Sequence, residues 1–550
     1  MPLRDPVYSL ETAMTYSFTS PARHRVRTAA VLALALASAC AKQNTPSSQS
    51  AIARSDGPSD QGPTLSARED GDATLGRQVF RFETFGNEGF WTDAVRLPAG
   101  MVAAKVTPLQ TLQLGLDVNV DALDATTQQA LAAQLKQDPS GRTSAILNDP
   151  AMTTALVKAN AVIGFSSRNG KVGASCALCH NMTDASVFSV PGGGSIGHEI
   201  DGPANHAINL GKIFSIAANS RALYPGLQLA LRANGGKSLG RAPAGLTENS
   251  TEEEVDAYLS NPSYYPVGTF DDTFDGNGNS VHNSALFRQD LAAPFGTEGS
   301  IARLDNFSNL VYTSLFDLTM LTTPGGRAFV HKLAGPAGDE MVDNYVKVLS
   351  ATHVTGYPFV LPNTTPHAKP GSEDAPVGVR VDNQKLLALN AYLVSLQAPR
   401  GKAIDEGVSS RGRETFRTAG CTSCHNANQG RPVPTTVHAM KEIFPGDNPT
   451  VLAQRDPPLN PVMNTPASTF DDKMAVVNAS IRGDKRGAAM PLMLDLARKP
   501  LFLHDNSVPS LDALFDPSRG STAPHPFFVS DVRQRSELVQ YLESLDTRSR

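Results

Sequence analysis

The sequence predicts a mainly α fold in which long ordered loops join the helices. In several segments apolar residues recur at i, i+3, i+4 and i+7, which is the pattern of one buried helix face. No stretch alternates apolar and polar residues for long enough to require a large sheet. The 44 glycines and 39 prolines interrupt the rest of the chain and indicate loops.

Two of the predicted helices carry nearly the same letters. Segment 389–396 reads Leu-Asn-Ala-Tyr-Leu-Val-Ser-Leu, and segment 538–545 reads Leu-Val-Gln-Tyr-Leu-Glu-Ser-Leu. Pro399 follows the earlier segment and stops its helix. The other segments with helical spacing are 122–137, 153–163 and 340–350.

A second pair of similar segments begins with Gly-Arg. Segment 412–417 reads Gly-Arg-Glu-Thr-Phe-Arg, and we expect a helix whose Phe416 faces helix 538–545. Segment 76–81 reads Gly-Arg-Gln-Val-Phe-Arg. It is either the first helix of an N-terminal domain or a coincidence of sequence.

Residues 1–39 have the layout of a signal peptide. A basic region precedes the apolar run 29–37, which is too short to span a bilayer, and small residues precede Cys40. We expect export to the periplasm and lipidation of Cys40; ordinary cleavage nearby is the alternative. Residues 40–70 are rich in Ser, Gly, Pro, Asp and Gln, which predicts a flexible tether.

Composition excludes some classes of partner. The formal net charge is -5, and the sequence has no basic patch of the kind that nucleic acid requires. We therefore expect no nucleic-acid partner, and contact with a membrane only through the lipid anchor. The chain after the tether is long enough for two or three domains.

Two pentapeptides carry the chemistry of the chain. Residues 176–180 read Cys-Ala-Leu-Cys-His, and residues 421–425 read Cys-Thr-Ser-Cys-His. Each is C-x-x-C-H, the attachment signature of c-type haem, in which two thiols add to the haem vinyl groups and the histidine binds the iron. A redox C-x-x-C is the alternative, but two copies among five cysteines disfavour it. The prediction is two covalent haems held by Cys176, Cys179, Cys421 and Cys424, with His180 and His425 as proximal ligands.

The ligand on the opposite face of each iron decides the function. Methionine there raises the reduction potential, histidine lowers it, and an open position admits a small molecule. For the second haem the candidates are Met490, which is otherwise a core methionine, and His504, which otherwise bonds backbone or a haem propionate. For the first haem they are His198 and His206, and each is otherwise a surface or hydrogen-bonded histidine. If neither binds, the first haem is the open, reactive one.

Segment 270–279 resembles a calcium loop, because its Asp and Asn side chains offer the oxygen ligands that a hard cation prefers. It is no EF-hand, since Ser280 and Leu286 replace the required glycine and glutamate. An ordinary Asp/Asn/Gly-rich turn is the alternative. The candidate ligands are Asp271, Asp275, Asn277 and Asn279.

The segment around His504 carries a family resemblance. Residues 502–511 read Phe-Leu-His-Asp-Asn-Ser-Val-Pro-Ser-Leu, which is similar to a signature near the C-terminus of the cytochrome c peroxidase-like superfamily of bacterial dihaem enzymes, including the rubber oxygenases. Asn506 stands where glycine is common. The resemblance favours His504 over Met490 on the second haem. It implies two cytochrome c-like haem domains, an N-terminal one at 71–398 enlarged by long insertions and loops and a compact one at 399–550.

Together these features predict a dihaem c-type cytochrome, a haem-binding oxidoreductase that transfers electrons. The size of its N-terminal part favours an enzyme of the peroxidase or oxygenase type, with an open first haem that acts on peroxide or dioxygen. The alternative is a carrier with two six-coordinate haems and no substrate chemistry. The expected partner is a redox protein or a quinol-linked donor.

Overall fold

The computed structural model describes residues 71–236, 242, 244–271, 276, 280–296, 301–363, 371–426, 428–433, 490–503, 506–521, 523 and 525–548. Residues Asp60–Arg550 form one compact unit. Several predicted features lie outside the described residues: the signal peptide and tether, Cys40, Asp275, Asn277, Asn279 and His504. The domain boundary at residue 398 stays a prediction.

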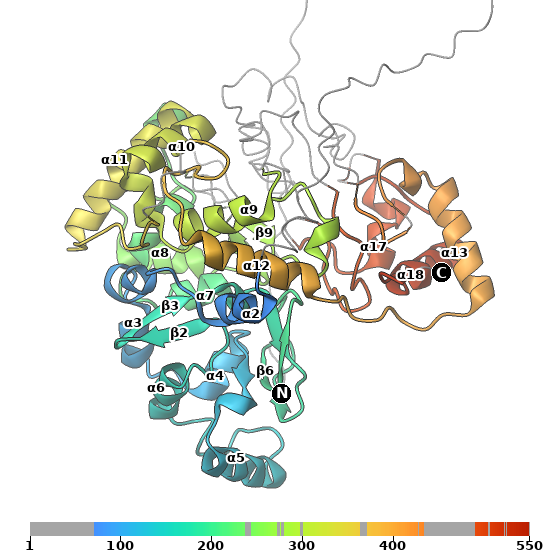
Figure 1. The fold of residues 1–550 in the computed structure, drawn as a ribbon, viewed down its shortest axis with the longest axis horizontal. Helices are drawn as coiled ribbons and strands as arrows, with labels where there is room; N and C mark the ends of the chain where they lie inside the picture. The colour runs from blue at the N-terminus through green and yellow to red at the C-terminus, as the bar shows by residue number, and fades with distance from the viewer. Residues whose placement is uncertain are drawn as a thin grey trace, which may run out of the picture. The chain divides into compact units, whose positions relative to one another are not determined.

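The helices predicted from apolar spacing are confirmed, each with shifted ends. Residues 389–395 lie in α12 and residues 538–543 in α18, while segment 412–417 lies wholly in α13 and segment 76–81 wholly in α2. The described α-helices are α2 (Ala73–Phe82), α3 (Leu97–Ala103), α4 (Pro108–Gln113), α5 (Ala125–Gln137), α6 (Pro150–Lys158), α7 (Leu210–Phe214), α8 (Glu252–Leu259), α9 (Leu304–Leu310), α10 (Pro324–Ala334), α11 (Pro336–Ala351), α12 (Asn383–Ser395), α13 (Glu406–Thr418), α17 (Leu511–Leu514) and α18 (Val532–Glu543) (Figure 1).

Short strands form several small sheets among these helices. Strands β1, β6 and β5 make a three-stranded sheet in that order, with β1 parallel and β5 antiparallel to β6, and the other described strands pair as antiparallel β2–β3, β4–β7 and β8–β9. The strands are β1 (Val118–Asn119), β2 (Phe165–Arg168), β3 (Lys171–Ala174), β4 (Asn181–Thr183), β5 (Phe188–Ser189), β6 (Ser195–Gly197), β7 (Glu199–Asp201), β8 (Thr269–Asp271) and β9 (Ser280–His282).

The predicted fold class is therefore wrong. The described residues form a mixed α/β fold with several small sheets, and they do not divide into two clear cytochrome c-like domains. The strands span only two to four residues each, which is too short for an alternating pattern to be recognised in the sequence. The loops that were expected around the helices contain these sheets.

Two helix pairs repeat the same packing. Helix α2 crosses α12, and α13 crosses α18 (Figure 1). The aromatic rings of Phe80 and Tyr392 are 5.8 Å apart in the first pair, and those of Phe416 and Tyr541 are 6.0 Å apart in the second. Segment 76–81 is thus no coincidence, because it packs on its partner helix as segment 412–417 does.

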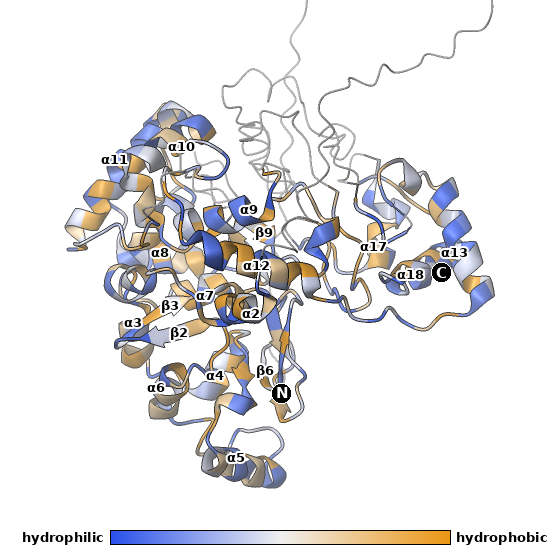
Figure 2. Ribbon diagram, in the orientation of Figure 1, coloured by the Kyte–Doolittle hydropathy of each residue, from blue (hydrophilic) through white to orange (hydrophobic). Residues whose placement is uncertain are grey.

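The two pairs differ in burial. Helix α12 buries eight of its residues and α13 only three, so α12 lies inside the molecule while α13 presents a wide face to solvent. Figure 2 shows the difference as more orange on α12 and more blue on α13. No helix among the described residues is long and apolar enough to cross a membrane.

Close helix contact requires glycine at the centre of the second crossing. A Cβ atom on Gly412 would overlap the carbonyl oxygen of Glu537 and the Cβ of Tyr541. We expect Gly412→Ala to lower the free energy of unfolding by about 2 kcal/mol, although alanine is the better helix former. The control is Gly407→Ala in the same helix, where the nearest atoms are the flexible ends of Asp405 and Arg411. Equal urea midpoints for the two variants would contradict this packing.

Candidate functional site

Both C-x-x-C-H motifs line one cavity of about 1400 Å³. This exceeds the roughly 300–1,000 Å³ of an ordinary small-molecule pocket. The rest of the lining is mostly apolar. It is made by side chains from residues 91–318 and from residues 393–542. The motif residues that line it are Cys176, Cys179, His180, Cys421, Cys424 and His425.

The first motif follows the β2–β3 hairpin and is fastened to α2. The side chain of Asn87 pairs with both backbone groups of Ala174, at 2.8 and 2.9 Å. The Ser175 hydroxyl donates to the carbonyl oxygen of Arg81 at 2.7 Å. The motif then makes a 3₁₀ turn over Cys176–Leu178. Helix α2 therefore leads into the first motif in space, although the two are far apart in sequence.

Strand β7 closes over the end of the first motif. Arg81 pairs with Glu199 at 2.6 Å and with Asp201 at 2.9 Å, which ties β7 to α2. The next backbone N–H, that of Gly202, donates to the carbonyl oxygen of His180 at 2.9 Å. This ion-pair network thereby positions the histidine of the motif.

The imidazole of His180 is neutral, and its Nε2 carries no proton. Its Nδ1 lies 2.6 Å from the carbonyl oxygen of Ser284. A carbonyl oxygen only accepts hydrogen bonds, so Nδ1 carries the proton and Nε2 has a free lone pair. Burial lowers the pKa of His180 to about 4, which keeps the ring neutral at pH 7. Metal-bound histidines are commonly oriented by such a bond.

The motif cysteines do not have the properties of a redox dithiol. None of the four is in a disulfide in the described structure. Burial raises the pKa of Cys176 to about 11, of Cys179 to about 12 and of Cys421 to about 11. Catalytic C-x-x-C cysteines have a lowered pKa instead. The hydroxyl of Tyr312 lies 3.3 Å from the sulfur of Cys176.

The second motif follows α13 directly. Gly420 adopts φ 82°, a left-handed conformation that suits glycine, and this turns the chain from the helix into a 3₁₀ turn over Cys421–Ser423. The backbone N–H of His425 donates to the carbonyl oxygen of Cys421 at 2.8 Å. Downstream, the side chain of Gln429 accepts from the backbone N–H of Met493 at 3.0 Å. This bond brings the segment that contains Met490 to the second motif.

The structure places some of the candidates for the ligand on the opposite face of each iron in the cavity and others outside it. Met490 is 8% exposed and lines the cavity, and His206 lines it as well. His198 does not line it: its side chain is 61% exposed and pairs with Asp121 at 3.0 Å. A role for His198 therefore rests on the sequence alone.

Asp271, the one candidate calcium ligand that the structure describes, and the single tryptophan, Trp91, also line the cavity. Asp271 is 5% exposed, and its backbone N–H donates to the hydroxyl of Tyr265 at 3.2 Å. Within the described ranges, no group of three or more His, Cys, Asp or Glu residues could hold a metal ion. Trp91 is 3% exposed, as expected of a core residue, and its ring centre lies 5.7 Å from that of Phe214.

Three cavity residues were missed in the sequence. Lys499 contacts the Nε2 atom of His282 at 3.1 Å. The ring centre of His525 lies 6.2 Å from that of His425, and burial lowers the pKa of His525 to about 4. The Nδ1 atom of His525 is buried and has no hydrogen-bond partner in the part of the chain that the structure describes. None of these residues belongs to a spaced motif, so only the fold could reveal them.

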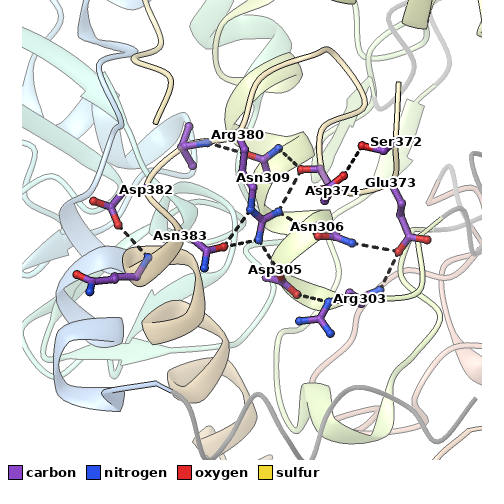
Figure 3. A network of polar contacts seen from close by, with 12 residues as sticks. Arg303, Asp305, Asn306, Asn309, Ser372, Glu373, Asp374, Arg380, Asp382 and Asn383 are labelled. Atoms are coloured by element: carbon purple, nitrogen blue, oxygen red, sulfur yellow. Dashed lines mark hydrogen bonds and ion pairs between the residues drawn. The ribbon is translucent and has the colours of Figure 1, made fainter. Parts of the chain in front are cut away.

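Helix α9 forms one wall of the cavity through Leu304 and Phe307, and a buried polar network holds the helix in place (Figure 3). The Arg380 guanidinium is at its centre, 2.6 Å from Asp305 and 3.0 Å from the side-chain oxygen of Asn306. Arg380 also donates to Asn383 at the start of α12, so α9 and α12 are fixed together.

Comparison with known proteins adds little. No protein-family model matches the chain, and no curated protein matches it. Among solved structures, the chain is similar to hydrazine synthase from Kuenenia stuttgartiensis, in a structure pressurised with 20 bar xenon. The match has 15% identity and a TM-score of 0.22, and it covers 49% of this chain and 74% of that one. A TM-score this low carries no argument about fold or function.

Proposed function

We propose that this chain is a dihaem c-type cytochrome that transfers electrons through two covalently bound haems. The observation that carries the proposal is that both C-x-x-C-H motifs line one mostly apolar cavity. Two haems attached there would lie in the same cavity, so electrons could pass from one to the other without leaving the protein.

The residues present fit this cofactor. Each motif offers two thiols that are not in a disulfide for thioether bonds, and a histidine for the iron. In the first motif, the bond from His180 to Ser284 fixes the tautomer that leaves Nε2 free. When bound, haem supplies reversible one-electron chemistry at its iron. The protein attaches the cofactor, orients its ligands and excludes water with the apolar wall.

Export and lipid anchoring belong to the same proposal. They rest on the signal-peptide layout of residues 1–39 and on Cys40. The proposed partner is a redox protein or a quinol-linked donor at the membrane.

A second candidate function, reduction of peroxide or activation of dioxygen at an open first haem, is favoured by one feature of the wall. Trp91, Phe214 and Tyr265 make a chain of aromatic contacts along the cavity, with ring centres 5.7 and 6.3 Å apart. The indole N–H of Trp91 is buried and finds no acceptor among the residues described. A polar small molecule beside the first motif would supply that acceptor.

Electron paramagnetic resonance of the oxidised protein tests both functions. We expect two haems per chain in a pyridine haemochrome assay and a low-spin signal from the second haem, because Met490 and His525 line the same cavity as the second motif. A low-spin first haem identifies the carrier, and a high-spin first haem identifies the open, reactive site. A protein that carries no covalent haem would overturn the proposal.

The same spectra identify the ligand of the second haem. His525 lies beside His425, with ring centres 6.2 Å apart, and both line the cavity. His525 could therefore hold the second haem, which adds it to the candidates Met490 and His504. The alanine variant of the true ligand converts the second haem to high spin, and the other two variants serve as its controls.

A further inference from the structure

A cationic side chain lines the cavity, and no acidic side chain among the described residues pairs with it. Lys499 lines the cavity, and its ammonium nitrogen lies 3.1 Å from Nε2 of His282 and 5.7 Å from the ring centre of Phe502. Burial lowers the pKa of Lys499 to about 8, so most of the amine is protonated at pH 7. None of the described carboxylates forms an ion pair with it.

The two described residues beside Lys499, His282 and His206, add nitrogen groups and no negative charge. His206 lines the same cavity. Burial lowers the pKa of His206 to about 4, and the nearby positive charge of Lys499 makes a smaller contribution in the same direction. The Nδ1 atom of His206 is buried and has no hydrogen-bond partner within the described ranges. The ammonium group can only donate, so Nε2 of His282 accepts from it and orients it. Within the described part of the chain, the other two ammonium N–H groups have no acceptor.

A partly buried ammonium group without a counter-ion is costly, and a carboxylate offsets that cost through a charge-assisted hydrogen bond. The surrounding wall is mostly apolar, so the ligand that fits carries an apolar body and a carboxylate. Haem has this character, with an apolar macrocycle and propionate groups. A small carboxylic acid from solution has the same chemistry.

We propose that Lys499, oriented by His282 and next to His206, forms a carboxylate-binding subsite of the cavity that holds a haem propionate. The inference rests on the proposed function, because the propionate belongs to one of the two haems. Lys499 acts as a positioning residue: its positive charge stabilises the reduced, less positive haem and thereby raises the reduction potential.

The test compares Lys499→Met with Lys499→Arg and with Lys402→Met, an exposed lysine that pairs with Glu543. Haem per chain is counted first, and the midpoint potentials are then measured by spectroelectrochemical titration. We expect two haems in every variant. Lys499→Met should lower the one-electron reduction equilibrium constant of one haem about tenfold, equivalent to 59 mV. Lys499→Arg should restore most of this change, and Lys402→Met should cause none.

A second measurement separates the two sources of carboxylate. If a free acid occupies the subsite, calorimetry detects acetate binding to the unaltered protein and not to Lys499→Met, while the potentials of both agree. That result overturns the propionate assignment. Unchanged potentials together with no loss of acetate binding overturn the subsite altogether. A chain without haem would overturn the proposed function, and the acetate measurement would still decide the subsite. If Lys499→Met does not fold, His282→Gln, which removes the imidazole that orients the ammonium, is measured in the same way.

Discussion

Replacing Cys176 and Cys421 with alanine together is expected to abolish covalent haem attachment. Each motif offers only two thiols for its haem, and in the described structure no other cysteine lines the cavity. Loss of one thiol removes one thioether bond and leaves the cofactor poorly retained. Haem staining after denaturing electrophoresis and the intact mass of the chain both measure the result. The double variant should carry no haem, and each single variant should carry one.

The control for these variants lies inside the second motif. Ser423 occupies one of the variable positions; its hydroxyl donates to the carbonyl oxygen of Gly420 at 2.7 Å and lies 3.6 Å from the sulfur of Cys424. Ser423→Ala should therefore keep two haems. Cys179 and Cys424 remain in the double variant and could each form one thioether bond, so a double variant that carries as much covalent haem as the unaltered chain would contradict the assignment of both motifs. So would a loss of both haems from Cys421→Ala in a chain that remains folded.

The sequence predicted the helices well because their signal is local. Segment 389–396 was recognised by its apolar spacing, and all of it but Leu396 lies in α12. The helix begins earlier than predicted because Asp382 caps it, accepting hydrogen bonds from the backbone N–H groups of Gln384 and Lys385. Strand β4 gave no such signal. Its pairing of Asn181 with Asp201 in β7 lies beside buried ion pairs rather than on an alternating apolar face.

Some residues of the candidate site could likewise be predicted from the sequence, and others could not. The cysteines and histidines of the two motifs could be predicted because haem attachment fixes their spacing in sequence. Lys499 and His282 could not, because they are far apart in sequence and only the fold brings them to the same wall of the cavity. The resemblance of residues 502–511 to dihaem enzymes drew attention to His504, which lies outside the described residues. His525 has no motif, and only its place beside His425 makes it a candidate.

Replacing Arg380 with methionine is expected to lower the free energy of unfolding by about 3–5 kcal/mol. The Arg380 side chain is buried, and it pairs with Asp305, which is 4% exposed, at 2.6 Å (Figure 3). Methionine fills much of the same volume but leaves the carboxylate of Asp305 buried with a weaker set of partners. It also removes the hydrogen bonds to Asn306 and Asn383 that join α9 to α12. Urea denaturation measures the loss of stability, and faster hydrogen exchange in α9 locates it.

The matched control replaces Arg303, which contacts the same carboxylate, that of Asp305, from the solvent side. Arg303 pairs with Asp305 at 3.1 Å, but its own side chain is 43% exposed. Exposed ion pairs contribute at most about 1 kcal/mol, so Arg303→Met should cost far less than Arg380→Met. Adding Asp305→Asn to Arg380→Met removes the stranded charge and should recover part of the loss. If the two arginine variants cost the same, the stability of the α9 wall does not depend on the buried guanidinium, and its hold on the cavity would have to come from apolar packing through Leu304 and Phe307.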